Sequence, residues 1–156
     1  SAIGLFPSYL EAYYSRAGLK ATIQDYAGAM SDYNKAIELS PENPEIYYSR
    51  ATLKYSMKDS IGAIADYTKT ISLTPQSPEP YLYRGVLKFE KHEFSAAVAD
   101  LTKAIELNPN LADAYYYRGY AKSGGNIQNE TICTDLKKAA SLGHEQAAIE
   151  VKNSCK

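Results

Sequence analysis

The sequence has little of what most catalytic and nucleic-acid-binding sites need. Its 156 residues include no tryptophan, two histidines and two cysteines, and the formal net charge is −1. Because the lysines are spread through the chain and form no basic stripe, we expect no nucleic-acid partner. No apolar run approaches the length of a membrane span, and the N-terminal residues lack the charged and apolar regions of a secretory signal. We therefore expect no membrane-spanning segment.

Residues for active-site chemistry are equally scarce. His92 and His144 are far apart, and neither has a cysteine, aspartate or glutamate at metal-ligand spacing. The chain also has no nucleophile motif, no phosphate-binding glycine loop and no zinc motif. We therefore expect a protein that is not an enzyme and that uses no metal and no cofactor.

What the sequence does have is a repeat of 34 residues. EAYYSRAGLK from Glu11 matches EIYYSRATLK from Glu45, EPYLYRGVLK from Glu79 and DAYYYRGYAK from Asp113. The second half of the unit recurs as well, as AMSDYNKAIELSP, AIADYTKTISLTP and AVADLTKAIELNP. A fixed period of this length predicts stacked helical hairpins, which present long surfaces and rarely build a closed reaction pocket.

Apolar residues at helical spacing predict two helices in each unit. The first helices are expected at about 11–23, 45–57, 79–91 and 113–123, and the second helices at about 27–40, 61–74, 95–108 and 129–142. Pro41, Pro75 and Pro109 follow the second helices, where a residue that cannot continue a helix ends it sharply.

The units give a division of the whole chain. We expect repeats at 8–43, 44–77, 78–111 and 112–143, with a one-residue insertion near 124–126, because Asp135 follows Asp100 by 35 residues. Gly143 is expected to end the last second helix, and 144–156 to form a capping helix. Residues 1–7 resemble the tail of an earlier second helix, which favours a truncated array, although a dedicated N-terminal cap is the alternative.

The repeat resembles the tetratricopeptide (TPR) family in its large, small and proline positions. The large position holds Tyr13, Tyr47, Tyr81 and Tyr115, and the small position four residues later holds Ala17, Ala51, Gly85 and Gly119. The resemblance implies an all-α, right-handed superhelical solenoid of antiparallel helix hairpins. It also implies that the first helices line a concave groove, which binds peptides or partner proteins.

Two further columns of the repeat carry opposite charges on facing helices. The arginines are Arg16, Arg50, Arg84 and Arg118, and the aspartates are Asp32, Asp66, Asp100 and Asp135. Because an unpaired buried charge is costly, we interpret these residues as structural ion pairs and not as catalytic groups. A lysine column holds Lys20, Lys54, Lys88 and Lys122, whose stems we expect to cover apolar surface while their amines stay in solvent.

The remaining face of the first helices is the candidate partner-binding groove. It comprises Glu11, Tyr14, Glu45, Tyr48, Thr52, Tyr55, Glu79, Leu82, Val86, Phe89, Asp113, Tyr116 and Tyr120, together with Gly18, Ala21 and Ser123. Tyrosine suits recognition, and an aromatic, acid-edged groove predicts a partner segment with apolar and some basic residues. The alternative is that these rings pack between units while the acids complement helix N-termini.

One subtype of the family clamps C-terminal carboxylates with Lys, Asn and Arg. In this chain the positions of those clamp residues hold Tyr14, Gly18, Ser49, Glu79 and Tyr83, so we expect no such clamp.

The two cysteines leave two alternatives open. Cys133 and Cys155 flank Gly143, and antiparallel helices turning there would bring them within disulfide range. A disulfide predicts an oxidising, exported or periplasmic location, whereas unlinked thiols predict a cytoplasmic one.

The sequence as a whole predicts a non-catalytic protein-interaction module, part of a larger scaffold or adaptor. The alternative is a structural element that self-associates through its N-terminal half-repeat.

Overall fold

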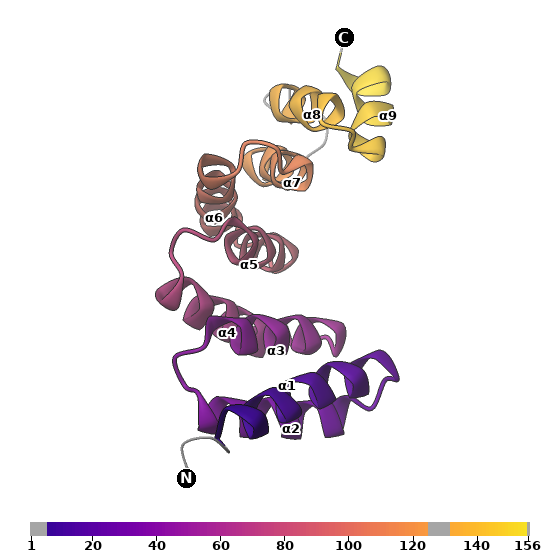
Figure 1. The fold of residues 1–156 in the computed structure, drawn as a ribbon. Helices are drawn as coiled ribbons and strands as arrows, with labels where there is room; N and C mark the ends of the chain where they lie inside the picture. The colour runs from indigo at the N-terminus through magenta and orange to yellow at the C-terminus, as the bar shows by residue number, and fades with distance from the viewer. Residues whose placement is uncertain (1–5, 125–131, 156) are drawn as a thin grey trace. The chain divides into compact units, whose positions relative to one another are not determined.

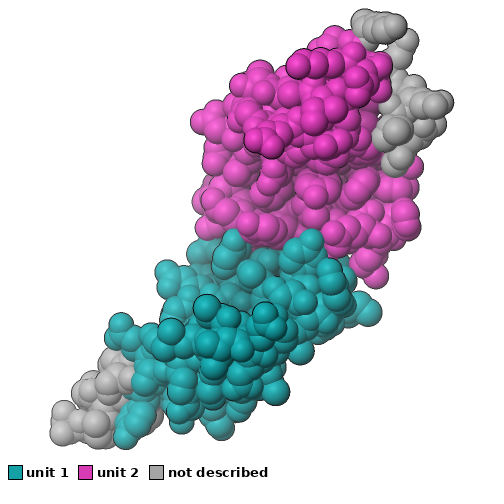
Figure 2. Space-filling view, turned by 90° about the vertical axis from the view of Figure 1, so that its right-hand side faces the viewer, with its two compact units in different colours: residues 1–75 teal, residues 76–156 magenta. Residues whose placement is uncertain are grey.

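The computed structural model describes residues 6–124 and 132–155, and these residues form nine helices and no strand (Figure 1). The chain divides into two compact units, residues 1–75 and 76–156 (Figure 2). Unit 1 contains α1 (Phe6–Thr22), α2 (Tyr26–Leu39), α3 (Pro44–Ser56) and α4 (Ser60–Leu73). Unit 2 contains α5 (Pro78–Glu90), α6 (Phe94–Leu107), α7 (Ala112–Lys122), α8 (Ile132–Ser141) and α9 (Glu145–Ser154).

Short polar residues and tight turns set the helix boundaries. Before α2, the carboxylate of Asp25 accepts the backbone N–H of Gly28 at 3.0 Å, and before α4 Asp59 accepts that of Gly62 at 2.9 Å. Each bond satisfies one of the N–H groups that the first turn of a helix leaves without a partner. The preceding turns reverse the chain through residues with positive φ, which are Gln24, Lys58, His92 and Gly124.

Small residues let the two helices of a hairpin approach closely. Ala17 in α1 and Ala29 and Ala36 in α2 are fully buried in unit 1. In unit 2, Gly85 occupies the place of Ala17 two units later, and a Cβ added there would lie 2.8 Å from Cγ of Leu101. The small column of the repeat is therefore a packing requirement of each hairpin.

The predicted helices are found in order, each from α2 to α7 beginning and ending one residue earlier than expected. The exception is α1, which begins at Phe6 and not at residue 11, so Phe6 and Pro7 belong to this helix and not to the tail of a preceding one. Proline suits a first helical turn because its missing N–H would have no partner there. Residues 1–5 and the expected insertion at 125–126 lie outside the described residues.

The C-terminal end follows the expected order. α8 is described from Ile132, so the predicted start at 129 lies outside the described part, and Gly143 with a φ of 93° separates α8 from α9. None of the described helices is long and apolar enough to cross a membrane.

Candidate functional site

An arginine–aspartate pair links the two helices of every hairpin. In the first hairpin, Nε and Nη2 of Arg16 each donate to a carboxylate oxygen of Asp32 at 2.7 Å. The same two-bond contact joins the other three expected pairs, Arg50–Asp66, Arg84–Asp100 and Arg118–Asp135. The partners are 16 residues apart in three pairs and 17 apart in the last, as one additional residue in the fourth turn requires.

The lysine column completes each pair as a three-residue cluster. Lys20 lies 2.9 Å from Asp32, and Lys54, Lys88 and Lys122 contact the aspartates of their own hairpins at 2.7, 2.8 and 3.0 Å. These ion pairs were not predicted from the sequence, although the side chains of Lys20 and Lys122 remain 28% and 41% exposed. Each lysine follows its arginine by four residues, so both cations lie on one helix face and reach the same carboxylate.

These clusters are structural. Each aspartate is at most 5% exposed, and no buried side-chain nitrogen or oxygen in the described part of the chain lacks a hydrogen-bond partner. Hydrogen bonds from Arg16 lower the pKa of Asp32 to about 2, against the opposing effect of burial and with help from Lys20. Burial raises the pKa of Asp135, but hydrogen bonds from Arg118 and Lys122 outweigh this effect, so the pKa of Asp135 is lowered as well.

Part of the expected groove in unit 2 is core. Leu82 and Val86 are only 6% and 8% exposed and belong to one cluster with Leu101. The expectation that these two contact a partner is therefore wrong, because neighbouring side chains close over them. The ring of Phe89 packs against those of Phe94, Tyr117 and Tyr120, at centroid distances of 5.8, 5.7 and 6.3 Å.

Helix α9 covers the aromatic face of α7. The ring of Tyr116 stacks on His144 at 4.2 Å, and the hydroxyls of Tyr116 and Tyr120 both donate to the carboxylate of Glu150. Burial raises the pKa of both tyrosines. These two predicted groove residues therefore bind a helix of their own chain, whereas Glu79 and Asp113 remain exposed.

A disulfide fixes α9 in this place. Cys133 in α8 and Cys155 after α9 are bonded, with Cα atoms 5.6 Å apart. Of the two alternatives for the cysteines, the structure has the linked one.

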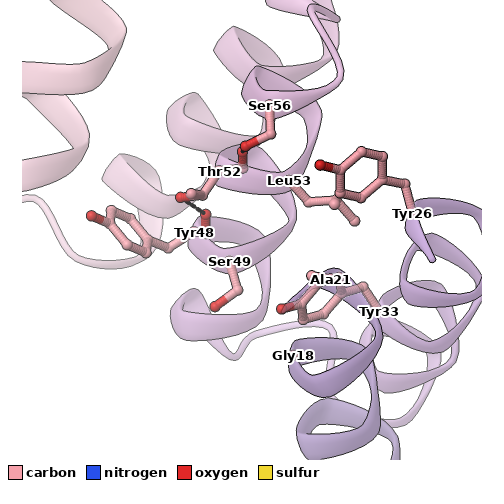
Figure 3. A pocket seen from close by; sticks show the side chains of 9 residues that line it. All are labelled: Gly18, Ala21, Tyr26, Tyr33, Tyr48, Ser49, Thr52, Leu53 and Ser56. Atoms are coloured by element: carbon pink, nitrogen blue, oxygen red, sulfur yellow. Dashed lines mark hydrogen bonds between the residues drawn. The ribbon is translucent and has the colours of Figure 1, made fainter. Parts of the chain in front are cut away.

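The corresponding face of unit 1 is open. A pocket of about 330 Å³ lies between α1, α2 and α3 (Figure 3). Its lining residues are Gly18, Ala21, Tyr26, Tyr33, Tyr48, Ser49, Thr52, Leu53 and Ser56. Tyr26 and Tyr33 reach from α2 toward α3, whose Ser49, Thr52 and Ser56 form the opposite wall (Figure 3). The pocket has no charged lining residue.

Neighbouring contacts hold the pocket walls in place. The hydroxyls of Tyr14 and Ser49 are 2.9 Å apart, and the ring of Tyr14 lies 6.0 Å from that of Tyr33. Burial raises the pKa of Tyr33, so its phenol is neutral across the physiological range. Thr52 donates to the backbone carbonyl of Tyr48 at 3.1 Å.

The groove prediction located this pocket only in part. It included Gly18, Ala21, Tyr48 and Thr52, and it missed Tyr26 and Tyr33, which come from the second helix. The remaining predicted residues of unit 1 divide by exposure. Glu11 and Glu45 are exposed, whereas Tyr14 and Tyr55 are half-buried.

Metal binding has no support in the described residues. Within 6–124 and 132–155, no three histidine, cysteine, aspartate or glutamate side chains gather as metal ligands would.

A family model described as TPR repeat matches residues 23–58 and 85–124. The chain carries tetratricopeptide repeats. This confirms the family predicted from the repeat, and similar solved structures confirm the all-α fold. No curated protein matches the chain.

Three solved structures illustrate the likeness of these tetratricopeptide repeats. A crystal structure of MamA protein has a TM-score of 0.82 and 24% identity, over 95% of this chain and 91% of that one. YrrB, a TPR protein with an unusual peptide-binding site, has a TM-score of 0.78 and 21% identity, over 92% of this chain and 74% of that one. The first TPR of Spaghetti (RPAP3), bound to the HSP90 peptide SRMEEVD, has a TM-score of 0.70 and 21% identity, over 74% and 92%.

Proposed function

We propose that this chain is a non-catalytic protein-interaction module that binds a peptide or partner-protein segment on the open face of α1 and α3. The observation that carries the proposal is the pocket of unit 1, which is concave and bordered by the rings of Tyr26 and Tyr33 (Figure 3). The repeats support it, since two structures of the same fold are described as having a peptide site or a bound peptide. We further propose that the module belongs to a larger scaffold or adaptor.

The partner segment carries apolar residues and some positive charge. The pocket has no charged lining residue, while Glu11 and Glu45 are exposed on the pocket-bearing sides of α1 and α3. An acidic tail such as SRMEEVD would meet carboxylates here and no clamp, because Tyr14, Gly18 and Ser49 hold three of the clamp places. Charge complementarity therefore favours a basic partner over an acidic one.

A charge placed in the pocket tests this function. Peptides are selected from a random display library on the intact chain, and their affinity is measured by calorimetry for wild type and Gly18→Lys. A Cβ at Gly18 meets no atom within 4 Å, and lysine is the better helix former, so the fold is retained. Binding should fall by about tenfold or more, because a cation next to an apolar ligand is costly.

The matched control is Ser31→Lys, which adds the same charge to an exposed position of α2 outside the pocket. It should bind as wild type does. Equal affinity of all three proteins, or failure to select any peptide, would contradict the proposal.

Self-association is the second candidate, and one exposed surface favours it. Leu19 is 70% exposed, whereas Leu53, its counterpart in the next repeat, is 4% exposed and packs with Tyr33 and Ala36 of α2. A second copy that places a helix on Leu19 and Ile23 would bury the same face. Light scattering over a range of concentrations tests this, and a monomer at every concentration, with Leu19→Lys indistinguishable from wild type, would reject it.

The disulfide supports an oxidising location for the protein. Alkylation of the protein from its own source without reductant, followed by intact mass measurement, should label neither Cys133 nor Cys155. Two labelled thiols would point to a reducing compartment instead.

A further inference from the structure

The pocket of unit 1 has a counterpart in unit 2, two repeat periods later. Four of its lining residues are Ala21, Tyr26, Ser49 and Thr52. The residues 68 positions further along are Phe89, Phe94, Tyr117 and Tyr120. Both sets lie on a first helix, the start of its second helix and the next first helix. The two places can therefore be compared position by position.

In unit 2 this place is filled by the protein itself. The ring of Phe89 lies 5.8 Å from Phe94 and 5.7 Å from Tyr117, tilted and edge-on respectively, and 6.3 Å from Tyr120. Such tilted and edge-on arrangements are the ones that aromatic pairs prefer. The ring of Phe89 is thus the central member of an aromatic cluster.

In unit 1 three of the four rings are missing. Alanine, serine and threonine replace the central phenylalanine and the two tyrosines, and only Tyr26 retains a ring at the place of Phe94. Gly18 stands where Val86 is buried, and a Cβ added to Gly18 would meet nothing within 4 Å. These replacements leave the opening of about 330 Å³ that Tyr26, Tyr33 and Leu53 border (Figure 3).

We propose that this pocket binds an aromatic side chain of the partner segment, which takes the place that the Phe89 ring fills in unit 2. The inference rests on the proposed function and names the residue that anchors the partner. Tyr26 offers the same ring contact to the ligand as Phe94 offers to Phe89, and Leu53 and Tyr33 supply further apolar surface.

The exposed carboxylates of Glu11 and Glu45 indicate which residue of the partner segment lies near its aromatic residue. Glu11 precedes Gly18 by seven residues, and Glu45 precedes Thr52 by seven. At the helical rise this is about 10 Å along each helix axis, which an extended peptide spans in about three residues. The partner segment therefore carries a lysine or arginine about three residues from its aromatic anchor.

A single amino-acid amide tests the pocket without a known partner. N-acetyl-L-phenylalaninamide and N-acetyl-L-alaninamide are titrated into the full chain, and the backbone amide signals of Gly18, Ser49 and Thr52 are followed by NMR. The phenylalanine compound should move these signals and bind about tenfold or more tightly than the alanine compound, because only its ring gains apolar burial. Equal weak effects of both compounds, or shifts elsewhere only, would overturn the inference.

Restoring the missing ring gives the matched variants. Ala21→Phe recreates the Phe89 arrangement and should abolish the shifts caused by the phenylalanine compound, whereas Ala65→Phe, at an exposed position of α4, should leave them unchanged. Gly18→Val places the side chain of Val86 at the equivalent position and adds fewer atoms than Ala21→Phe. It is the variant to use if Ala21→Phe fails to fold. Undiminished binding by a folded Ala21→Phe or Gly18→Val would overturn the inference.

The selected peptides separate this inference from the proposed function. Replacing the aromatic residue of a selected peptide with alanine should weaken its binding by about tenfold or more. If Gly18→Lys abolishes peptide binding but the aromatic replacement does not weaken it, the inference fails and the proposed function stands. If no peptide is selected while the phenylalanine compound binds, the proposed function and the partner segment are both rejected, and only an affinity of the pocket for an aromatic ring remains.

Discussion

The two units of this chain use one repeat in opposite ways. Unit 2 fills the space beside its second helix with Phe89, Tyr117 and Tyr120, and covers α7 with α9. Unit 1 leaves the equivalent space open beside Tyr26 and Tyr33. The same arrangement of helices thus carries a packed aromatic layer in one unit and an open pocket in the other, depending on a few side chains.

What the units share is the ion-paired frame. Every hairpin has an aspartate held by an arginine and a lysine, and every hairpin has a small residue where its helices meet. Because this frame does not depend on the aromatic layer, rings can be removed from one hairpin while its helices stay in place. Four experiments test this division between a common frame and a variable layer.

The largest effect should come from breaking the common frame. Asp100→Leu leaves Arg84 and Lys88 without their carboxylate and should lower the free energy of unfolding by about 3–5 kcal/mol. Asp66→Leu in unit 1 should cost a similar amount, since its contacts are the same. Urea unfolding measures both.

Two further variants sharpen this test. The double variant Arg84→Leu with Asp100→Leu should recover much of the loss, whereas Glu106→Leu, in an exposed pair with Lys103, should cost less than about 1 kcal/mol. Mild, additive effects of the Arg84 and Asp100 single variants would show that the pair is not part of the frame.

The next effect should come from releasing α9. Replacing Cys133 and Cys155 with serine opens a loop of 22 residues and should cost about 3 kcal/mol. Hydrogen exchange should then accelerate at the amides of α9 and α8, while the amides of α1 to α3 keep their protection. Reductant should destabilise wild type and leave the serine variant unchanged. An equal response of both proteins would show that the disulfide does not contribute to stability.

A smaller effect should follow from removing the central ring of the aromatic cluster in unit 2. Phe89→Ala should cost about 2–4 kcal/mol, less than a fully buried phenylalanine because Phe89 is half-buried. The variant should also gain a second site for N-acetyl-L-phenylalaninamide, detected as new NMR shifts at Phe94 and Tyr117. A variant that loses stability without gaining the site would mean that unit 2 collapses into the space.

The smallest effect should be that of acid. The pKa of Asp32 is lowered to about 2 and that of Asp135 is lowered as well, while an unfolded aspartate titrates near 4. A lowered folded-state pKa contributes stability that is complete above about pH 4 and is lost as the pH falls toward about 2. Urea unfolding between pH 5 and 2.5 should show this loss, and Asp32→Asn should flatten the part due to unit 1. An unchanged slope in this variant would assign the acid sensitivity to other groups.

Much of the frame could be predicted from the sequence because its signals are local and periodic. Apolar residues recur at helical spacing and prolines recur at fixed places, so the bounds of six helices were predicted within one residue. The recurring columns of arginine and aspartate on facing helices led to the same pairs that the structure contains.

The lysines and the aromatic layer were harder, because they depend on contacts between helices. The pattern places Lys20 on the face of Arg16 but does not show that Oδ2 of Asp32, which already accepts from Nε of Arg16, also contacts the amine of Lys20. Burial of Leu82 and Val86 depends on how far neighbouring rings close over them. The sequence of α9 does not match the repeat, so nothing in it indicated that Glu150 would accept from Tyr116.

One signal for the pocket was present in the sequence and needed a different comparison. Gly18 and Ala21 are smaller than Val86 and Phe89 at the same repeat positions. Aligning the repeats by side-chain size shows this loss of volume, although Tyr14 and Tyr33 are larger than Leu82 and Leu101 at their own positions.

The disulfide links the last two helices covalently and leaves the hairpins of unit 1 without such a link. Its two sulfurs tie the final helix to its neighbour, and the sequence holds no other cysteine with which to reinforce the opposite end. Fraying on heating should therefore begin among the N-terminal hairpins, where the tyrosine-framed opening lies. A partner bound in the pocket would then stabilise these hairpins reversibly, whereas the disulfide stabilises the last two helices permanently.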